Sequence, residues 1–451
     1  MCAVVLAMAC AGAPGCGESG AMDAPDAAAR PDRSVGGGAD ALWATEVVDE
    51  GDDVGLHVRL AVDEGGASHV AYFATEGEVV GPCDLGVEDD VPEEVRWTLR
   101  YATEAGSGWA REEVARVLSP GDPPGLDLAL DGSDPVIAAI TGGPVEGRLC
   151  QADDLGLHRR SAGWAPEVVV EESAQAATGM PASDFGTVVG HWPGLAIDGE
   201  RFALAYKDVH NGSIQTDDLT RADLELALGG GGAWSHVAVD PGRGAGSHNR
   251  AAFDARGRLV IAFVNPVEEI GALQQGLWVV RTADGGESWE RVLLAAGPMP
   301  STPALAVRGS RVHVLAYDAG RGVPRLHSLE DDMAFEELEH GWTNEVLGDP
   351  RYHEGLEPSL GVDRDGRLGA AWFRCARASD GLGSCDRESG LMFAWEDDGV
   401  WELERVTGGE TREECGMAPA LAFGPDGDAR VAYRCQRDGV EQVHLARREP
   451  L

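Results

Sequence analysis

The sequence predicts an all-β fold, a seven-bladed β-propeller of four-stranded antiparallel blades that is closed by its N-terminal strand. Three observations predict it. An apolar hairpin pattern occurs seven times along the 451 residues, a tryptophan pattern also occurs seven times, and the two patterns are offset at the chain ends. Self-similarity over tens of residues is typical of propellers and solenoids. The 62 glycines suit the many tight turns that short strands need.

The first pattern is an apolar strand that ends in a polar turn and continues into a second apolar strand. The first copy is Leu60-Ala-Val-Asp63 followed by His69-Val-Ala-Tyr72. The other six copies begin at Leu128, Leu195, Ala251, Leu305, Leu360 and Leu421. Short apolar runs separated by Asp and Gly are typical of strands joined by tight turns. We therefore expect these pairs to be the two inner strands, A and B, of each blade.

The second pattern is a tryptophan that begins a strand, usually with an acidic residue three positions later. It occurs at Trp43, Trp109, Trp164, Trp234, Trp289, Trp342 and Trp401. A third apolar strand, such as Leu99-Arg-Tyr-Ala102, lies between the two patterns. Each unit therefore has four strands, A to D from the inside outward.

The offset between the patterns predicts how the ring closes. The strand at residues 43–48 precedes every A strand, whereas the last unit, residues 417–449, ends before a D strand. The simplest arrangement places the 43–48 strand in the last blade, which removes the open edges of the ring. A β-solenoid is the alternative, but its repeats are shorter and lack this four-strand order.

One turn carries a family resemblance. Thr282-Ala-Asp-Gly-Gly-Glu-Ser-Trp289 resembles the Asp-box of the sialidase-like BNR-repeat propellers, whose pattern is Ser/Thr-x-Asp-x-Gly-x-Ser/Thr-Trp. In such a turn the Asp accepts N–H groups, the glycine takes left-handed dihedrals and the Trp anchors the turn between sheets. The resemblance implies a propeller in which Asp284 and Trp289 are structural and lie on the face away from the site. Two decayed copies occur at residues 103–109 and 396–401.

The resemblance does not extend to sialidase activity. Sialidases need an arginine triad, a Tyr nucleophile with a Glu partner, an acid Asp and an early Phe-Arg-Ile-Pro motif. That motif is absent from this sequence, and only Arg59 and Arg250 occupy comparable inner-strand positions. Sialidases also have six blades where this sequence indicates seven. The catalytic residues are therefore left unassigned.

The lengths of the connections predict the binding face. The A–B turns are tight, whereas the B–C and D–A segments are long, for example residues 74–96, 170–191 and 374–390. Long loops over a rigid scaffold are common binding sites. Because the A strands run from this loop face into the channel, their first residues line its mouth. We expect a polar ligand site made of His57, Arg59, Asp127, His191, Trp192, His248, Arg250 and Glu357, with His210 and the pair His353-Glu354 on nearby loops. The alternative is a water-filled channel whose mouth is merely polar. No metal site and no cofactor are predicted.

Six cysteines outside the leader are predicted to form disulfides. The expected pairs are Cys375–Cys385, Cys415–Cys435 and Cys83–Cys150, all in or beside the loop-face segments. A metal-thiolate site is the alternative, but the spacings do not match zinc ligand pairs.

The N-terminal region predicts export. Residues 1–15 are apolar, small and uncharged, as in a signal peptide. Cys16 resembles the lipid-modified cysteine of bacterial lipoproteins, Cys10 is a second candidate, and a plain cleaved signal is the alternative. We therefore divide the chain into a signal segment with a lipobox at residues 1–16, a disordered linker at residues 17–40 and the propeller at residues 41–451. The expected location is the outer membrane or cell surface, or the secreted fraction.

The charge limits the partners. A formal net charge of −41 argues against binding to the phosphate backbone of nucleic acids. The leading interpretation is a monomeric recognition module that binds a protein or a glycan on its loop face. The alternative is a glycan-active hydrolase or lyase at the channel mouth, with Glu357, Asp127 and His248 as the acid–base candidates.

Overall fold

The computed structural model describes most of the chain from Trp43 to Glu449. The described ranges are 43–82, 93–106, 108–119, 123, 125–142, 153–160, 163–170, 189–208, 223–230, 232–240, 245–266, 274–298, 302–330, 334–336, 341–375, 389–407, 414–437 and 439–449. All of them lie in one compact unit, residues 36–451. None of the described residues forms a helix that is long and apolar enough to span a membrane.

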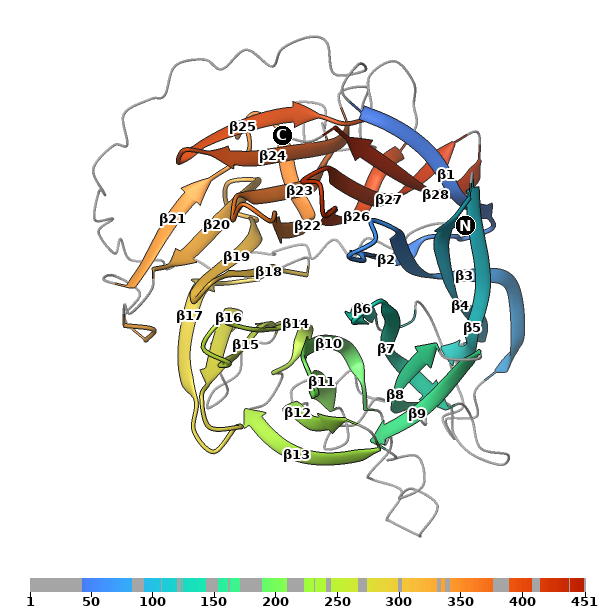
Figure 1. The fold of residues 1–451 in the computed structure, drawn as a ribbon, viewed down its shortest axis with the longest axis horizontal. Coiled ribbons are helices and arrows are strands. Elements are labelled where there is room, and N and C mark those ends of the chain that lie inside the picture. The colour runs from blue at the N-terminus through green and yellow to red at the C-terminus, as the bar shows by residue number, and fades with distance from the viewer. Residues whose placement is uncertain are drawn as a thin grey trace, which may run out of the picture. The chain divides into compact units, whose positions relative to one another are not determined.

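This unit is a seven-bladed β-propeller, as predicted, with the first strand of each blade innermost (Figure 1). Blade 1 contains β2 (Leu56–Val62), β3 (Ser68–Pro82), β4 (Glu93–Ala105) and β5 (Gly108–Ser119). Blade 2 contains β6 (Leu126–Asp131), β7 (Asp134–Gly142), β8 (Asp153–Arg160) and β9 (Trp164–Val170). Blade 3 contains β10 (His191–Asp198), β11 (Arg201–Asp208), β12 (Asp223–Gly230) and β13 (Ala233–Asp240). Blade 4 contains β14 (Ser247–Phe253), β15 (Leu259–Asn265), β16 (Gly276–Thr282) and β17 (Glu290–Ala296).

The remaining blades follow the same antiparallel order. Blade 5 contains β18 (Ala304–Arg308), β19 (Arg311–Asp318), β20 (Val323–Leu329) and β21 (Trp342–Val346). Blade 6 contains β22 (His353–Val362), β23 (Leu368–Cys375), β24 (Gly390–Asp397) and β25 (Val400–Arg405). Blade 7 contains β26 (Glu414–Phe423), β27 (Ala429–Arg437) and β28 (Val440–Arg448), and its fourth strand is β1 (Trp43–Gly51).

The N-terminal strand closes the ring, as the offset of the two patterns predicted. Strand β1 pairs antiparallel with β28, from Trp43 opposite Arg448 to Gly51 opposite Glu441. A second link joins blades 7 and 1, because the Arg430 guanidinium donates to the Gly66 carbonyl at 2.7 Å. The first and last described strands of the chain therefore share one sheet.

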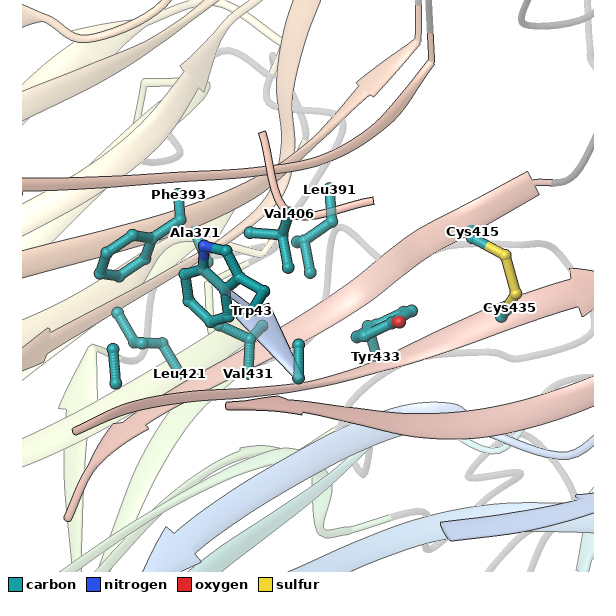
Figure 2. Close-up of a cluster of buried hydrophobic side chains, with 12 residues drawn as sticks. Trp43, Ala371, Leu391, Phe393, Val406, Cys415, Leu421, Val431, Tyr433 and Cys435 are labelled. Atoms are coloured by element: carbon teal, nitrogen blue, oxygen red, sulfur yellow. A yellow bond between two sulfur atoms is a disulfide. The ribbon is translucent and has the colours of Figure 1, made fainter. Parts of the chain in front are cut away.

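The B strands are mostly apolar because both faces of each blade are covered by neighbouring blades. Every residue of β15 and of β23 is buried. The core therefore consists of separate clusters between successive blades. Figure 2 shows the cluster around Trp43, whose indole packs edge-on against Phe393 with ring centroids 5.1 Å apart.

The tryptophan pattern marks hydrogen bonds between blades. The indole Nε1 of each of four tryptophans donates to the Glu that stands three residues after the tryptophan of the preceding blade. The pairs are Trp164 with Glu112, Trp234 with Glu167, Trp401 with Glu345 and Trp43 with Glu404, at 2.8–3.0 Å. These contacts give the acidic residue of the repeat a structural role. The pair that contains Trp43 extends the series across the closure.

Three blades depart from this series. Val237 and Val292 stand where the Glu partners of Trp289 and Trp342 would be. The Nε1 of Trp289 has no hydrogen-bond partner among the described residues, and that of Trp342 donates instead to the Phe335 carbonyl at 3.0 Å. The Nε1 of Trp109 also lacks a partner in the described part of the chain, although Glu46 stands at the corresponding position.

The turn from Thr282 to Trp289 has the contacts that its spacing predicted. Asp284 accepts the backbone N–H of Ser288 at 3.0 Å and the Ser288 hydroxyl at 2.6 Å, and these bonds lower its pKa to about 2. Gly285 and Gly286 have φ of 72° and 94°. Trp289 packs on the apolar cluster between blades 3 and 4. The residues of this turn therefore support the scaffold.

One predicted disulfide is confirmed. Cys415 and Cys435 face each other on β26 and β27 and are bonded (Figure 2). Cys375 is disulfide-bonded too, but its predicted partner Cys385 lies outside the described residues. The predicted pair Cys83–Cys150 and the proposed lipid site Cys16 also lie outside them.

Candidate binding site at the channel mouth

Five A strands begin with the same local distortion. His57, Trp192, His248, Glu357 and Ala418 have φ of 56°, 47°, 56°, 50° and 48°, in the left-handed region that L-residues rarely adopt. The register with the B strand shifts at each of these points, as at a β-bulge. Because one of the five residues is an alanine, the bulge does not depend on a polar side chain and is a feature of the backbone near the start of these A strands. The other four residues carry polar or aromatic side chains that could contact a ligand.

A glycine precedes each bulge by two residues and makes it possible. Gly55, Gly190, Gly246, Gly355 and Gly416 have φ between 88° and 108°. At Gly355 a Cβ would lie 2.6 Å from the Pro324 backbone N, and at Gly416 it would lie 2.6 Å from the Leu391 backbone N. These two glycines therefore pack directly against the C strand of the preceding blade.

Arg59, Asp127 and Arg250 line one cavity of about 250 Å³ at the centre of the ring. Each stands immediately before the apolar start of its repeat, so the three occupy equivalent positions in blades 1, 2 and 4. The other blades place Gly194, Ala304, Ser359 and Ala420 at this position. Charged residues therefore occupy this position in three of the seven blades.

Asp127 is held by several partners. Its Oδ2 accepts the backbone N–H of Leu195 in the next blade at 2.9 Å, and its Oδ1 accepts that of Leu128 at 3.1 Å. Arg59 Nε lies 3.5 Å from the same Oδ1. Glu357 is engaged in a similar way, because its Oε2 accepts the backbone N–H of Ala418 at 2.6 Å. Both carboxylates thus join neighbouring A strands.

The two arginines are less well compensated. Arg59 and Arg250 each donate through Nη1 to the carbonyl of the preceding residue at 2.8 Å. Burial, followed by repulsion from Arg59, lowers the pKa of Arg250 to about 9, and Asp127 acts in the opposite sense. Burial also lowers the pKa of Arg59, against the attraction of Asp127 and Glu357. Among the described residues Arg250 has no carboxylate within ion-pair distance, so two half-buried cations lie close together around one half-buried anion.

Two histidines of the mouth, His57 and His248, are neutral near pH 7. Burial, followed by the Arg59 charge, lowers the pKa of His57 to about 4, and its Nε2 donates to the Pro123 carbonyl at 2.8 Å. Burial, followed by the Arg250 charge, lowers the pKa of His248 to about 3. His248 Nδ1 lies within hydrogen-bond distance, 2.9 Å, of the Thr302 hydroxyl.

Trp192 packs against two histidines of the mouth. Its ring lies 5.7 Å from the His191 ring and 4.9 Å from the His248 ring, measured between centroids. All eight predicted mouth residues lie in the first part of an A strand.

Lys207 is a residue of this region that sequence reasoning missed. It comes from the B strand β11, is fully buried, and donates through Nζ to the Ser247 hydroxyl at 2.8 Å. Its ammonium lies 5.2 Å from the Trp192 ring, and burial lowers its pKa to about 7. The available signal was that Lys207 is the only lysine of the chain and interrupts an apolar strand.

Glu354 corrects one expectation, because it does not belong to the mouth. It lies within β22, not on a loop, and is completely buried. Arg374 pairs with it at 2.6 Å and the Trp372 Nε1 donates to it at 3.0 Å. Glu354 is thus part of the interior of blade 6. His210 lies outside the described residues, and within the described ranges no three His, Cys, Asp or Glu side chains gather to hold a metal ion.

No protein-family model matches this chain, and no curated protein matches it by sequence. Solved structures resemble it at low identity. The Hadza microbial sialidase Hz136 is 13% identical over 90% of this chain and 96% of its own, with a TM-score of 0.45. The GH93 α-L-arabinofuranosidase of Fusarium graminearum is 12% identical over 80% and 98% of the two chains, with a TM-score of 0.45. The Aleuria aurantia lectin is 13% identical over 79% of this chain and 97% of its own, with a TM-score of 0.43.

A mutant of Trypanosoma rangeli sialidase is 11% identical with a TM-score of 0.47, and the match covers 86% of this chain but only 60% of that one. Similarity at this level does not establish what the present chain binds. The function must be argued from its own residues.

Proposed function

We propose that this chain is a recognition propeller that binds a carboxylate-bearing glycan at the loop-face mouth of its channel. The observation that carries the proposal is Arg250, a half-buried guanidinium on the wall of the central cavity that has no carboxylate partner among the described residues and is repelled by Arg59. An anionic group placed between the two arginines would remove this repulsion and accept charge-assisted hydrogen bonds. Arg59 stands beside the site but already faces Asp127, with Nε 3.5 Å from Oδ1, so Arg250 is the guanidinium that the anion would chiefly engage.

The acidity of the whole chain does not oppose this assignment. Repulsion from distant surface carboxylates is screened over about 8 Å at physiological ionic strength, whereas a half-buried guanidinium acts at contact. The −41 net charge therefore disfavours polyanions that must cover a large surface. A ligand that inserts a single carboxylate is affected far less.

Binding fits the geometry better than the alternative, glycan hydrolysis or elimination at the mouth. Asp127 and Glu357, the carboxylate candidates, already accept backbone N–H groups of the next A strand. His248 has a pKa of about 3 and is therefore a poor general acid at neutral pH. These contacts suit fixed, pre-organised side chains.

We further propose that the protein is exported and acts as a monomer, tethered to the outer membrane through Cys16 or secreted. The Cys415–Cys435 disulfide supports export, because such bonds persist in oxidising compartments. A protein ligand on the outer loops is the other partner that this location allows.

Isothermal titration calorimetry with galacturonic acid oligomers tests the function, with the methyl-esterified oligomers as the uncharged match. We expect the free acid to bind, with an affinity that falls as salt rises. Arg250→Met should weaken binding about tenfold or more, the cost of losing a hydrogen bond between charged groups. This variant should still fold, since it removes a half-buried charge without an ionic partner.

Arg311→Met is the matched control. Arg311 pairs with Glu330 at 2.8 Å on the opposite face, so its loss should leave affinity unchanged. Equal binding of the free acid and the ester, or an Arg250→Met variant that binds as well as the wild type, would disprove the proposal.

A further inference from the structure

A second cavity lies between blades 4 and 5, away from the channel. Its volume is about 570 Å³, within the range of roughly 300–1,000 Å³ typical of small-molecule sites. One wall is the end of β17, from Leu294 to Pro298, and the other is formed by the end of β19, the turn after it and β20. Figure 1 shows β17 at the outer edge of blade 4, which is followed around the ring by blade 5. Because D and B strands both end on the loop face, the cavity opens there.

One polar group of this cavity is a fixed ion pair. Asp318 Oδ2 pairs with Arg325 Nη2 at 2.6 Å. The Asp318 Oδ1 accepts the backbone N–H groups of Gly320 and Arg321 at 3.1 and 3.2 Å, which fixes the carboxylate in the turn. Both side chains remain about one quarter exposed, and Arg325 Nε has no hydrogen-bond partner among the described residues. The ion pair has no net charge, and it leaves Arg325 Nε as a possible hydrogen-bond donor.

The second polar group is His327, which lines the same cavity and is 2% exposed. Burial, followed by the Arg325 charge, lowers its pKa to about 4, so the ring is neutral at pH 7. A hydrogen bond to the Asn344 side chain engages the ring, and its Nδ1 has no partner within the described ranges. In the tautomer whose Nε2 carries the proton, Nδ1 is a hydrogen-bond acceptor. A buried polar atom without a partner requires a physical explanation.

We propose that this interblade cavity is a second binding site, independent of the channel mouth, and that it takes a neutral pyranose. A hydroxyl group both donates and accepts, so sugar hydroxyls match the His327 Nδ1 acceptor and the Arg325 Nε donor together. The C–H face of the ring would lie on the apolar wall of Leu294, Ala295 and Ala316. Because both nitrogens are buried in the structure, binding requires side-chain rotations that bring them to the cavity surface.

The electrostatics of the cavity select against charged ligands. An anion that approached Arg325 would meet the Asp318 carboxylate, and a cation that approached Asp318 would meet the guanidinium. Each of these ligand ions would therefore find its oppositely charged partner already neutralised by the other member of the ion pair. The channel mouth differs in this respect, because Arg250 there has no carboxylate of its own among the described side chains. The two sites should therefore separate neutral from acidic sugars.

The experiment is saturation-transfer NMR with neutral methyl pyranosides of the gluco, galacto, manno and 6-deoxy-galacto series at millimolar concentration. We expect at least one of them to bind the wild type. Ala296→Trp, at an exposed position on the cavity rim, should fill the site without removing a contact and abolish the signal. Arg325→Met should weaken binding about tenfold, the cost of one lost hydrogen bond to a charged donor.

Two variants serve as controls for the location of the pyranoside site. Arg311→Met lies in the same blade on the opposite face, and Arg250→Met alters the channel mouth. Both should bind the pyranoside as the wild type does, so a failure of the mouth proposal leaves this test intact. Absence of binding by every pyranoside, or binding that Ala296→Trp leaves unchanged, would overturn the assignment.

Discussion

The indole Nε1 of Trp164 donates to the Glu112 carboxylate at 2.9 Å and so joins the outer strands of blades 2 and 1. Arg160 donates to the same carboxylate at 3.1 Å. At the closure, Glu404 accepts bonds in the same way from Trp43 at 3.0 Å and from Arg448 at 2.8 Å. One repeated contact therefore stabilises ordinary blade boundaries and the boundary that holds the chain ends together.

Val237→Glu should restore this contact where it is missing. Val237 and Trp289 both lie close to Gly286, because a Cβ on that glycine would lie 3.0 Å from Val237 Cγ1 and 3.5 Å from Trp289 Cζ2. A carboxylate at position 237 would satisfy the Trp289 Nε1, which has no partner in the described part of the chain. We expect a gain of about 1 kcal/mol in the free energy of unfolding, measured by chemical denaturation.

Two variants test the cause of that gain. Val168→Glu, on an exposed position of another D strand, should give no comparable stabilisation. Trp289→Phe should remove the benefit of Val237→Glu in a double-mutant cycle. A gain that persists with phenylalanine would show that the carboxylate acts through something other than the indole.

Deletion of residues 41–49 should destabilise the ring. It removes most of β1, including Trp43 and its hydrogen bond to Glu404, and it exposes the edge of β28 to pairing with other molecules. We expect a lower melting temperature and aggregates in size-exclusion chromatography. Deletion of residues 17–30, within the predicted linker, is the control. Unchanged melting and a single monomer peak for the 41–49 deletion would contradict the closure mechanism.

Lys207→Met should change how stability depends on pH. The folded-state pKa of Lys207 is about 7, below the ordinary value of 10.5, so the unfolded chain binds more protons between these values. The penalty for burying the ammonium is therefore complete below pH 7 and disappears as pH rises to 10.5. Denaturation at several pH values should show the wild type gaining roughly 2 kcal/mol or more relative to Lys207→Met over this window. Parallel curves for the two proteins would mean that the amine titrates normally.

His158→Leu should stabilise the protein, most of all in acid. His158 is buried, neither ring nitrogen has a hydrogen-bond partner among the described residues, and burial lowers its pKa to about 4. Such a histidine makes the fold lose stability as pH falls from 6.5 towards 4, because the unfolded chain takes up the proton first. We expect a gain of about 1 kcal/mol at neutral pH from removing an unsatisfied polar group, and more at acid pH. His236→Leu, at an exposed position, is the control and should show neither effect.

The sequence repeat predicted the propeller because each four-strand blade needs the same pattern of apolar strands and turns. Leu60 and its counterparts lie in the inner strands of all seven blades, and Trp43 without an A strand before it was enough to predict the closure. The mouth residues followed from strand direction, since the first side chains of the A strands must meet at the channel. The repeat does not predict which side chain of a B strand contacts a residue of an A strand. Lys207, on a B strand, contacts Trp192, and Glu354 is buried where it forms an ion pair with Arg374.

The left-handed residues at the start of the A strands were also beyond the sequence, because nothing in His57 or Ala418 itself indicates a positive φ. Ala418→Gly tests whether this conformation is strained. Ala418 has φ of 48°, and the left-handed region costs an L-residue about 1–2 kcal/mol. Glycine lacks this penalty, so the variant should be about 1 kcal/mol more stable despite the greater freedom of the unfolded chain. Ala420→Gly, two residues later in ordinary strand conformation, should be destabilising by a similar amount. If both variants lose stability equally, the bulge is not strained at Ala418, and the other four positions need no compensation for it either.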